Sequence, residues 1–235
     1  MCNNLDMPAG SIRARVRAEM VTEIKTVARR HLATDGANLS LRAVARDMGM
    51  VSSALYRYFA SRDDLLTALI IDAYNGLGAA VEDADAAVIE RSDLRGRLLI
   101  LGRAVRRWAL ANPAEYALIF GSPVPGYAAP ADTVVAAQRT PDVLLGIFVD
   151  GFAAKALRAP TGELAPALGA DMTAARDAIA PGLPREVFAV GTIAWIHIFG
   201  AVSFELFGQL NNVIEARDEY FDYQMGQIAR LVGLE

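Results

Sequence analysis

The segment from Ser52 to Tyr58 carries the side chains best suited to binding nucleic acid. Leu55 and Phe59 are four residues apart, so on a helix they share one face, which we expect to be buried. The other side then presents Ser52, Ser53, Tyr56 and Arg57, with Tyr58 beside them. Hydroxyl and guanidinium groups bond phosphate oxygens, and serine and arginine also read base edges. The pattern predicts a DNA-recognition helix. The alternative is a plain helical hairpin with an incidental aromatic stripe.

Few residues are suited to catalysis. The chain has two histidines, His31 and His197, and a single cysteine, Cys2. Ser203 lies six residues after His197, on a different side of a helix, so the two cannot pair within it. The His-Glu-x-x-His spacing of a metal site is absent, and one cysteine cannot form a disulfide within the chain. We therefore expect no enzyme, no metal site and no cofactor.

The recognition helix needs neighbours that cover its apolar face. Apolar residues recur every four positions from Met20 to Leu32 and predict an amphipathic first helix over 11–32. Ser40 stands where it can cap a second helix over 41–48. Gly49 ends that helix, because glycine tolerates the left-handed conformation of a sharp exit.

Two further helices are expected after this turn. Ser52 can cap a short helix over 53–59, which is the predicted recognition helix. Ser61 and Asp64 then form a variant of the capping box, which opens a long helix. Short helices joined by a tight glycine turn predict a helix-turn-helix motif over about 40–59, whose second helix enters the major groove.

The distribution of charge agrees with a DNA-binding N-terminal part. Residues 1–62 hold 10 Arg and Lys against 5 Asp and Glu, a net charge of +5. Residues 63–235 hold 13 against 22, a net charge of −9. The total of −4 therefore combines a basic head with an acidic body, an asymmetry that suggests nucleic-acid binding at the head but also occurs on ordinary solvated surfaces.

The segment from Leu39 to Leu66 resembles the N-terminal domain of the tetracycline-repressor family of bacterial transcriptional regulators. The resemblance covers about residues 11–70 and is carried by Gly49, the Leu-Tyr-Arg-Tyr-Phe run and the Ser-Arg-Asp-Asp-Leu run that follows. It implies DNA contacts by Arg42, Ser52, Ser53, Tyr56, Arg57, Tyr58 and Arg62. Met50 stands at a turn position usually filled by valine, a packing change that leaves these contacts intact.

Residues 71–235 are expected to form a helical domain for effector binding and dimerisation. The expected elements are a helix over 93–112, a short helix over 113–120, a proline-rich loop over 121–130, a helix over 139–157, an irregular surface segment over 158–184, an apolar helix over 187–204, and a final helix with an apolar stripe between Ile214 and Val232. Together with the first domain, they predict an all-α protein.

The stretch 187–204 contains no Asp, Glu, Lys or Arg. It is near the lower limit for a membrane span, but its polar residues and flanking glutamates favour a helix buried on both sides, one of them against a second subunit. The family resemblance implies a four-helix dimer interface. The residues expected in it are Ile196, Gly200, Phe204, Phe207, Phe221, Met225 and Ile228.

Aromatic residues in the body can line an apolar effector pocket, although such a set can also be ordinary core. They are Trp108, Tyr116, Phe120, Phe148, Phe152 and Trp195. The run 194–208 is also similar to the C-terminal domain of one branch of the family, named for a Trp, a His and a Gly. Trp195 and Gly200 fit that pattern, but Phe199 stands where the His is expected, and His197 is interpreted as a satisfied histidine on a buried helix.

The sequence as a whole predicts a homodimeric transcriptional repressor in the cytoplasm, whose DNA-binding domain comprises residues 1–70. Its expected partners are a palindromic DNA operator, a second copy of the chain and a small, mostly apolar effector that releases the DNA. The alternative is a DNA-binding regulator without a small effector, controlled by a protein partner.

Overall fold

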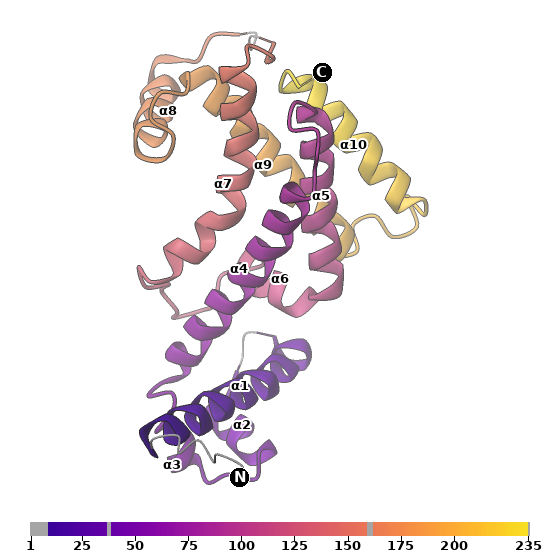
Figure 1. Cartoon of the computed structure of the whole chain (residues 1–235). Helices are drawn as coiled ribbons and strands as arrows, with labels where there is room; N and C mark the ends of the chain where they lie inside the picture. Colours follow the sequence, from indigo (N-terminus) through magenta and orange to yellow (C-terminus); the bar gives the residue numbers. More distant parts are fainter. Residues whose placement is uncertain (1–8, 37–38, 159–161, 235) are drawn as a thin grey trace, which may run out of the picture. The chain divides into compact units, whose positions relative to one another are not determined.

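The computed structural model describes residues 9–36, 39–158 and 162–234, which form ten helices and, beyond one isolated bridge, no strand. Figure 1 shows the helices in their order along the chain. They are α1 (Ala9–Asp35), α2 (Leu41–Asp47), α3 (Ser52–Leu55), α4 (Arg62–Ala86), α5 (Leu94–Ala111), α6 (Pro113–Phe120), α7 (Thr133–Ala153), α8 (Pro166–Ile179), α9 (Arg185–Leu206) and α10 (Arg217–Leu231). The expectation of an all-α fold is confirmed.

The chain divides into two compact units. The first unit comprises the described residues up to Ala73 together with Ala114–Thr133. The second unit comprises Tyr74–Pro113 and the described residues from Val134 onward. The division falls inside α4, so this helix belongs to both units. The first unit thus includes α6 and the proline-rich loop, a segment that the sequence analysis places in the body.

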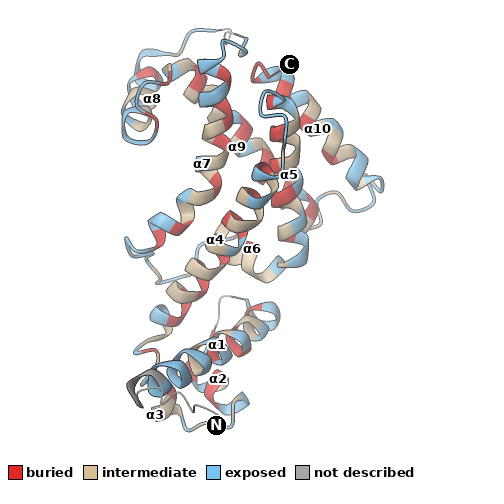
Figure 2. Ribbon diagram, viewed as in Figure 1, coloured by how far each residue is buried: buried red, intermediate tan, exposed pale blue. Residues whose placement is uncertain are grey.

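The first unit is held together by the amphipathic face of α1. Ile24, Ala28 and Leu32 recur at intervals of four residues and are buried, as the spacing predicts. They pack in one cluster with buried side chains of α2, α3 and α4, among them Val44 and Leu55. Figure 2 shows these buried positions along one side of α1 and on the short helices. This core fixes the direction in which α3 faces.

Two serines begin helices as predicted. The Ser40 hydroxyl accepts a hydrogen bond from the backbone N–H of Ala43 at the start of α2, and the Ser61 hydroxyl accepts one from Asp64 at 3.0 Å at the start of α4. Gly49 has a φ of +65°, the left-handed conformation expected of it after α2. These local signals set the lengths of the helices around α3.

Asp93 caps α5, and its Oδ1 accepts the N–H of Gly96 at 2.8 Å. Replacing Asp93 by alanine is expected to lower the free energy of unfolding by about 1 kcal/mol, because a first-turn N–H loses its acceptor. Chemical denaturation of the wild type and the variant measures this difference. Asp93→Asn keeps an acceptor and is expected to lose much less, so equal losses in the two variants would rule out the cap as the cause.

The recognition helix is shorter than predicted. It begins at Ser52, because the carbonyl of Val51 already accepts the N–H of Ala54 at 2.9 Å, and its N-cap is Val51, not Ser52. After Leu55 the chain continues as a turn, in which Tyr58 and Phe59 both donate their backbone N–H to the carbonyl of Leu55. The irregular end leaves this turn dependent on side-chain contacts from elsewhere.

Two other boundaries in the body differ from the sequence prediction. α7 covers Thr133–Ala153 rather than 139–157, and Pro141 lies inside it. The segment 158–184, expected to be irregular, contains α8 with Pro166 in its first turn, where a missing N–H costs nothing. Proline therefore did not mark a helix end at either place.

α9 is central to the second unit, where it packs against α5, α8 and α10. Its buried residues include Ala194, Ile198 and Val202, and α5 contributes Leu98 and Leu101 to the same core. By length and composition alone, α4 and α9 are apolar enough to cross a membrane, a test that core helices of globular proteins also pass.

Candidate DNA-binding surface and ligand cavity

The outward side of α3 and the turn after it form a polar surface on the first unit. Leu55 and Phe59 are buried, as predicted, which turns the intervening residues outward. Ser53, Tyr56 and Arg57 are exposed, and so is Arg42 on α2. Ser52 and Tyr58 are half-buried. The surface thus presents two guanidinium groups, a phenol and a serine hydroxyl, which suit phosphate oxygens and base edges.

The charge of this surface is predominantly positive. Arg46 is exposed beside Arg42 on α2. The acidic residue nearest in sequence, Asp47, is 2.8 Å from Nε2 of His31 on α1. Asp47 also lies 3.8 Å from the Nε of Arg46, so it offsets part of the charge of that arginine, whereas no ion pair is seen for Arg42 or Arg57 among the described residues.

Arg17 of α1 holds the irregular end of the recognition segment, a role that the sequence analysis missed. Its two terminal nitrogens each donate a hydrogen bond to the carbonyl of Arg57, both at 3.2 Å. Its guanidinium also lies 5.2 Å from the centre of the Tyr58 ring. Arginines spaced along α1 were visible in the sequence, but their partners forty residues away were not.

Arg62, expected to contact phosphate, has a bond within the unit. Its Nε donates to the carbonyl of Leu39 at 3.1 Å, and one terminal nitrogen is 3.5 Å from Asp63. The side chain therefore fastens the start of α4 to the residue before the Ser40 cap.

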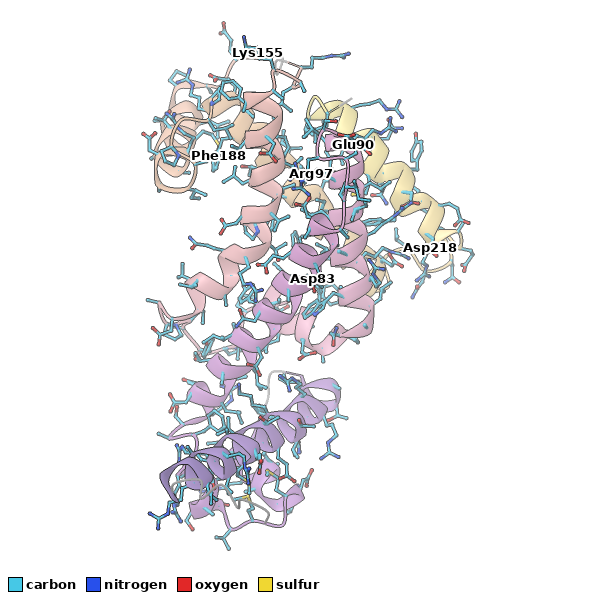
Figure 3. The ribbon with its side chains drawn as sticks, viewed as in Figure 1. Asp83, Glu90, Arg97, Lys155, Phe188 and Asp218 are labelled. Atoms are coloured by element: carbon cyan, nitrogen blue, oxygen red, sulfur yellow. The ribbon has the colours of Figure 1, made fainter. Side chains whose placement is uncertain are left out.

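The second unit contains an apolar cavity of about 280 Å³ between α7, α8 and α9. It is lined by Pro141, Leu144, Leu145, Phe148, Ile179, Val187, Phe188, Gly191, Thr192 and Trp195. Figure 3 shows Phe188 among the side chains of this part of the unit. Phe188 was missed by the sequence analysis, although its distance of seven residues from Trp195 puts both on one face of α9.

Of the six aromatic residues expected in a pocket, the structure brings Phe148 and Trp195 together. Trp108 lines a separate groove between α4 and α5, with Asp83 and Arg107. Phe152 is exposed. Tyr116 and Phe120 belong to the first unit, where their ring centres are 5.0 Å apart. Helical spacing shows which residues share a face, but it does not show which cavity that face lines.

α7 is attached to α4 on both sides of its cavity-lining residues. Arg139 bonds Glu82 through its Nε at 2.8 Å, and its terminal nitrogen bonds both the carbonyl and the side chain of Asn75. Asp150 receives a bond from Arg97 of α5 at 2.6 Å. Arg97 in turn bonds Asp85 of α4, so the second attachment runs through α5.

The expected interface residues fall into two groups. Ile193, Ile196 and Phe204 are exposed on α9, as is Phe207 at its C-cap, and Gly200 lies between them. We call these five residues the α9 stripe. Phe221, Met225 and Ile228 are instead buried within their own chain, where the first two lie against Gly102 of α5. The outward apolar residues of α10 are Tyr223 and Leu231.

His197 is not the satisfied histidine that was expected. Its Nε2 is buried and has no hydrogen-bond partner among the described residues. Because burial disfavours the charged imidazolium, the pKa of His197 lies below its ordinary value. Among the same residues, no group of three or more His, Cys, Asp or Glu side chains could hold a metal ion.

Two family models match the chain. Residues 24–69 match the model of bacterial regulatory proteins of the tetR family, and residues 98–228 match the tetracyclin repressor-like C-terminal domain. HTH-type transcriptional regulators Rv1816 of Mycobacterium tuberculosis and Mb1846 of Mycobacterium bovis are each 41% identical to the chain over 203 residues, which cover 84% of it and 85% of each relative.

Two solved structures resemble the whole chain. The regulatory protein SCO4313 is 33% identical, with a TM-score of 0.74, and the match covers 94% of this chain and 98% of that one. A regulatory protein of the tetR family from Rhodococcus RHA1 has a TM-score of 0.63 over 91% of this chain and 96% of its own. At 16% identity, this second likeness concerns the fold alone.

Proposed function

Since the chain belongs to the tetracycline-repressor family of transcriptional regulators, which bind DNA and are not enzymes, we propose that it is a homodimeric repressor. In this proposal the first unit binds a palindromic operator, and the second unit forms the dimer. A small apolar molecule in the second unit's cavity releases the DNA. The protein acts in the cytoplasm.

The exposed arginines and hydroxyls around α3 carry the DNA-binding proposal. Their position depends on the buried Leu55 and Phe59 and on the bonds from Arg17, so they are held before DNA arrives. Because the backbone of the segment is held in this way, DNA binding does not have to order it, and the entropy cost falls on the exposed side chains alone. Arg57 on the recognition segment is the proposed base-edge contact, and Arg42 on α2 is the proposed phosphate contact.

The α9 stripe supports the dimer. Isolated exposed apolar residues are common, but Ile193, Ile196, Phe204 and Phe207 follow one face of one helix. A second copy of the chain would cover this face by a two-fold contact of α9, with α10 beside it. The two recognition segments would then enter successive major grooves about 34–36 Å apart, which requires a palindromic site.

The cavity supports regulation by a ligand. A ligand that prefers a conformer unable to bind DNA well must weaken DNA binding. By linkage, bound DNA weakens ligand binding by the same free energy. Sequencing the DNA bound by the purified protein identifies the operator, and the purified complex then tests release. If apolar compounds bind the protein but leave operator affinity unchanged, control by a protein partner takes the place of the small effector.

The double variant Arg42→Ala, Arg57→Ala is expected to bind the operator far more weakly, because a base contact is worth about 1–3 kcal/mol and removing one phosphate contact lowers the salt slope by about 0.9. Titrations of labelled operator at several salt concentrations measure both quantities. Arg95→Ala, which removes an exposed arginine from α5, is the matched control and should leave both unchanged. Wild-type affinity in the double variant at equal salt would show that this surface does not bind the DNA.

A further inference from the structure

The chemistry of the cavity in the second unit restricts the molecules that it can hold. None of its ten lining residues carries a charge. The polar side-chain groups among them are the hydroxyl of Thr192 and the indole N–H of Trp195. The hydroxyl already donates to the carbonyl of Phe188 at 3.1 Å, so towards a ligand it can only accept.

Three charged residues that flank the cavity in sequence, on α8 and α9, already have contacts, whereas Asp142 beside Pro141 on α7 is exposed. Arg176, one turn before Ile179 on α8, has its buried Nε 3.0 Å from the carboxylate of Asp177 but without hydrogen-bond geometry, and its terminal nitrogen donates to the carbonyl of Leu183 at 3.2 Å. At the start of α9, the Nε of Arg185 lies 2.7 Å from Oε1 of Glu186. A carboxylate inside the cavity would have to draw Arg176 away from these contacts, and an ammonium group there would find no carboxylate among the lining residues.

We infer that the cavity binds an uncharged, largely apolar molecule whose buried part carries at most one hydrogen-bonding group, and that it rejects carboxylates and ammonium groups alike. An ionised group buried without a partner is strongly disfavoured, whereas one hydroxyl or carbonyl can be met by Thr192 or Trp195. The volume of about 280 Å³ suits a ligand at the small end of the usual range. The regulatory role of the cavity rests on the proposed function. Its selectivity for uncharged molecules does not.

The selectivity is tested with one probe and three competitors on the full-length wild-type chain. The probe is N-phenyl-1-naphthylamine, an uncharged fluorophore that brightens in apolar surroundings. The competitors are 1-decanol, decanoate and decylammonium, which share a ten-carbon chain and differ in the head group, each below its micelle concentration. We expect 1-decanol to displace the probe, and the two ions to be at least tenfold weaker.

Several results would overturn the inference. If decanoate displaced the probe as well as 1-decanol does, Arg176 would be accepting an anion. If decylammonium did so, Asp142 or the aromatic rings would be holding a cation. Absence of saturable probe binding would mean that the cavity does not take molecules of this class. None of these measurements involves DNA, so failure of the regulatory proposal would instead appear as operator binding that the cavity's ligands do not change.

A pair of variants assigns the probe to this cavity. A side chain at Gly191 would extend from a position 3.5 Å from the Phe148 ring, an ordinary contact, so Gly191→Leu fills the cavity without a backbone clash. It should weaken probe binding at least tenfold. Gly146→Leu on α7 is the control, since its Cβ meets nothing within 4 Å, and it should leave probe binding unchanged. Equal effects of the two substitutions would place the probe elsewhere, and the competition order in the wild type does not depend on either variant folding.

Discussion

Replacing Arg97 by methionine is expected to lower the free energy of unfolding by about 3–5 kcal/mol, the usual cost of breaking a buried ion pair from one side. The Arg97 side chain is 2% exposed, and its Nε donates to Asp85 at 2.9 Å. Methionine fills a similar volume, so the loss comes from the buried carboxylate left behind rather than from an empty space. Arg91 still contacts Asp85, which favours the lower end of that range.

The control for this variant is Arg103→Met. Arg103 of α5 pairs with Asp222 of α10 at the surface, and removing an exposed pair should cost less than about 1 kcal/mol. Denaturant unfolding of the two variants at neutral pH gives the comparison. A second test is Asp85→Leu added to Arg97→Met, which removes both charges and should restore much of the stability. If the Arg97 variant loses no more than the Arg103 variant, the buried pair does not stabilise the second unit.

The difference between the wild type and Arg97→Met should depend on pH. Burial raises the pKa of Asp85, but hydrogen bonds from Arg97 and Arg91 outweigh it, so the pKa lies below its ordinary value. A carboxylate with a lowered pKa in the folded state contributes its stability above the pKa of the unfolded chain, about 3.9, and loses it on further acidification. The two proteins should therefore converge in stability as the pH falls below about 4.

Replacing Gly200 by arginine is expected to convert the proposed dimer to a monomer. A Cβ at Gly200 meets nothing within 4 Å in the single chain, and arginine is the better helix former, so the monomer should fold at least as well as the wild type. Within a two-fold interface the same side chain would bury an unpaired charge from each copy. A cost of several kcal/mol raises the dissociation constant at least about 100-fold.

Sedimentation equilibrium distinguishes the two states, because the wild type should have twice the chain mass of 25.2 kDa and the variant that mass once. Gly146→Arg also places an arginine in open space, on α7 away from the α9 stripe, and should remain dimeric. If Gly200→Arg formed dimers with the same dissociation constant as the wild type, the α9 stripe would not be the interface. A monomeric wild type would contradict the dimer itself.

The starts of α2 and α4 and the turn at Gly49 were predictable because their signals are local, whereas the length of α3 was not. A serine cap needs only the next turn of the same helix, as at Ser40 and Ser61, and the exit at Gly49 needs only its own backbone. The family resemblance, confirmed by both matching domain models, rests on the same segment. The outward direction of Arg57 follows from the burial of Leu55, which the spacing of the apolar residues predicted.

Features that depend on long-range contacts were not predictable. The apolar stripe of the last helix shows that Met225 is covered, but not that α5 of the same chain covers it. Trp108 and Trp195 look equivalent in sequence, yet they line different hollows because α5 and α9 face different neighbours. Proline marks helix ends in most sequences, so Pro141 concealed the first part of α7.

The attachment of α7 at Arg139 and Asp150 has a mechanical consequence for the cavity. The cavity-lining residues of α7 lie between these two points, and a stretch of helix held at both ends responds to a load in its middle by bending rather than by sliding. Pro141, two residues after Arg139, cannot donate the backbone hydrogen bond that would stiffen the helix there. A load on this stretch would therefore bend it most easily beside Arg139, whose side chain bonds Asn75 and Glu82 of α4.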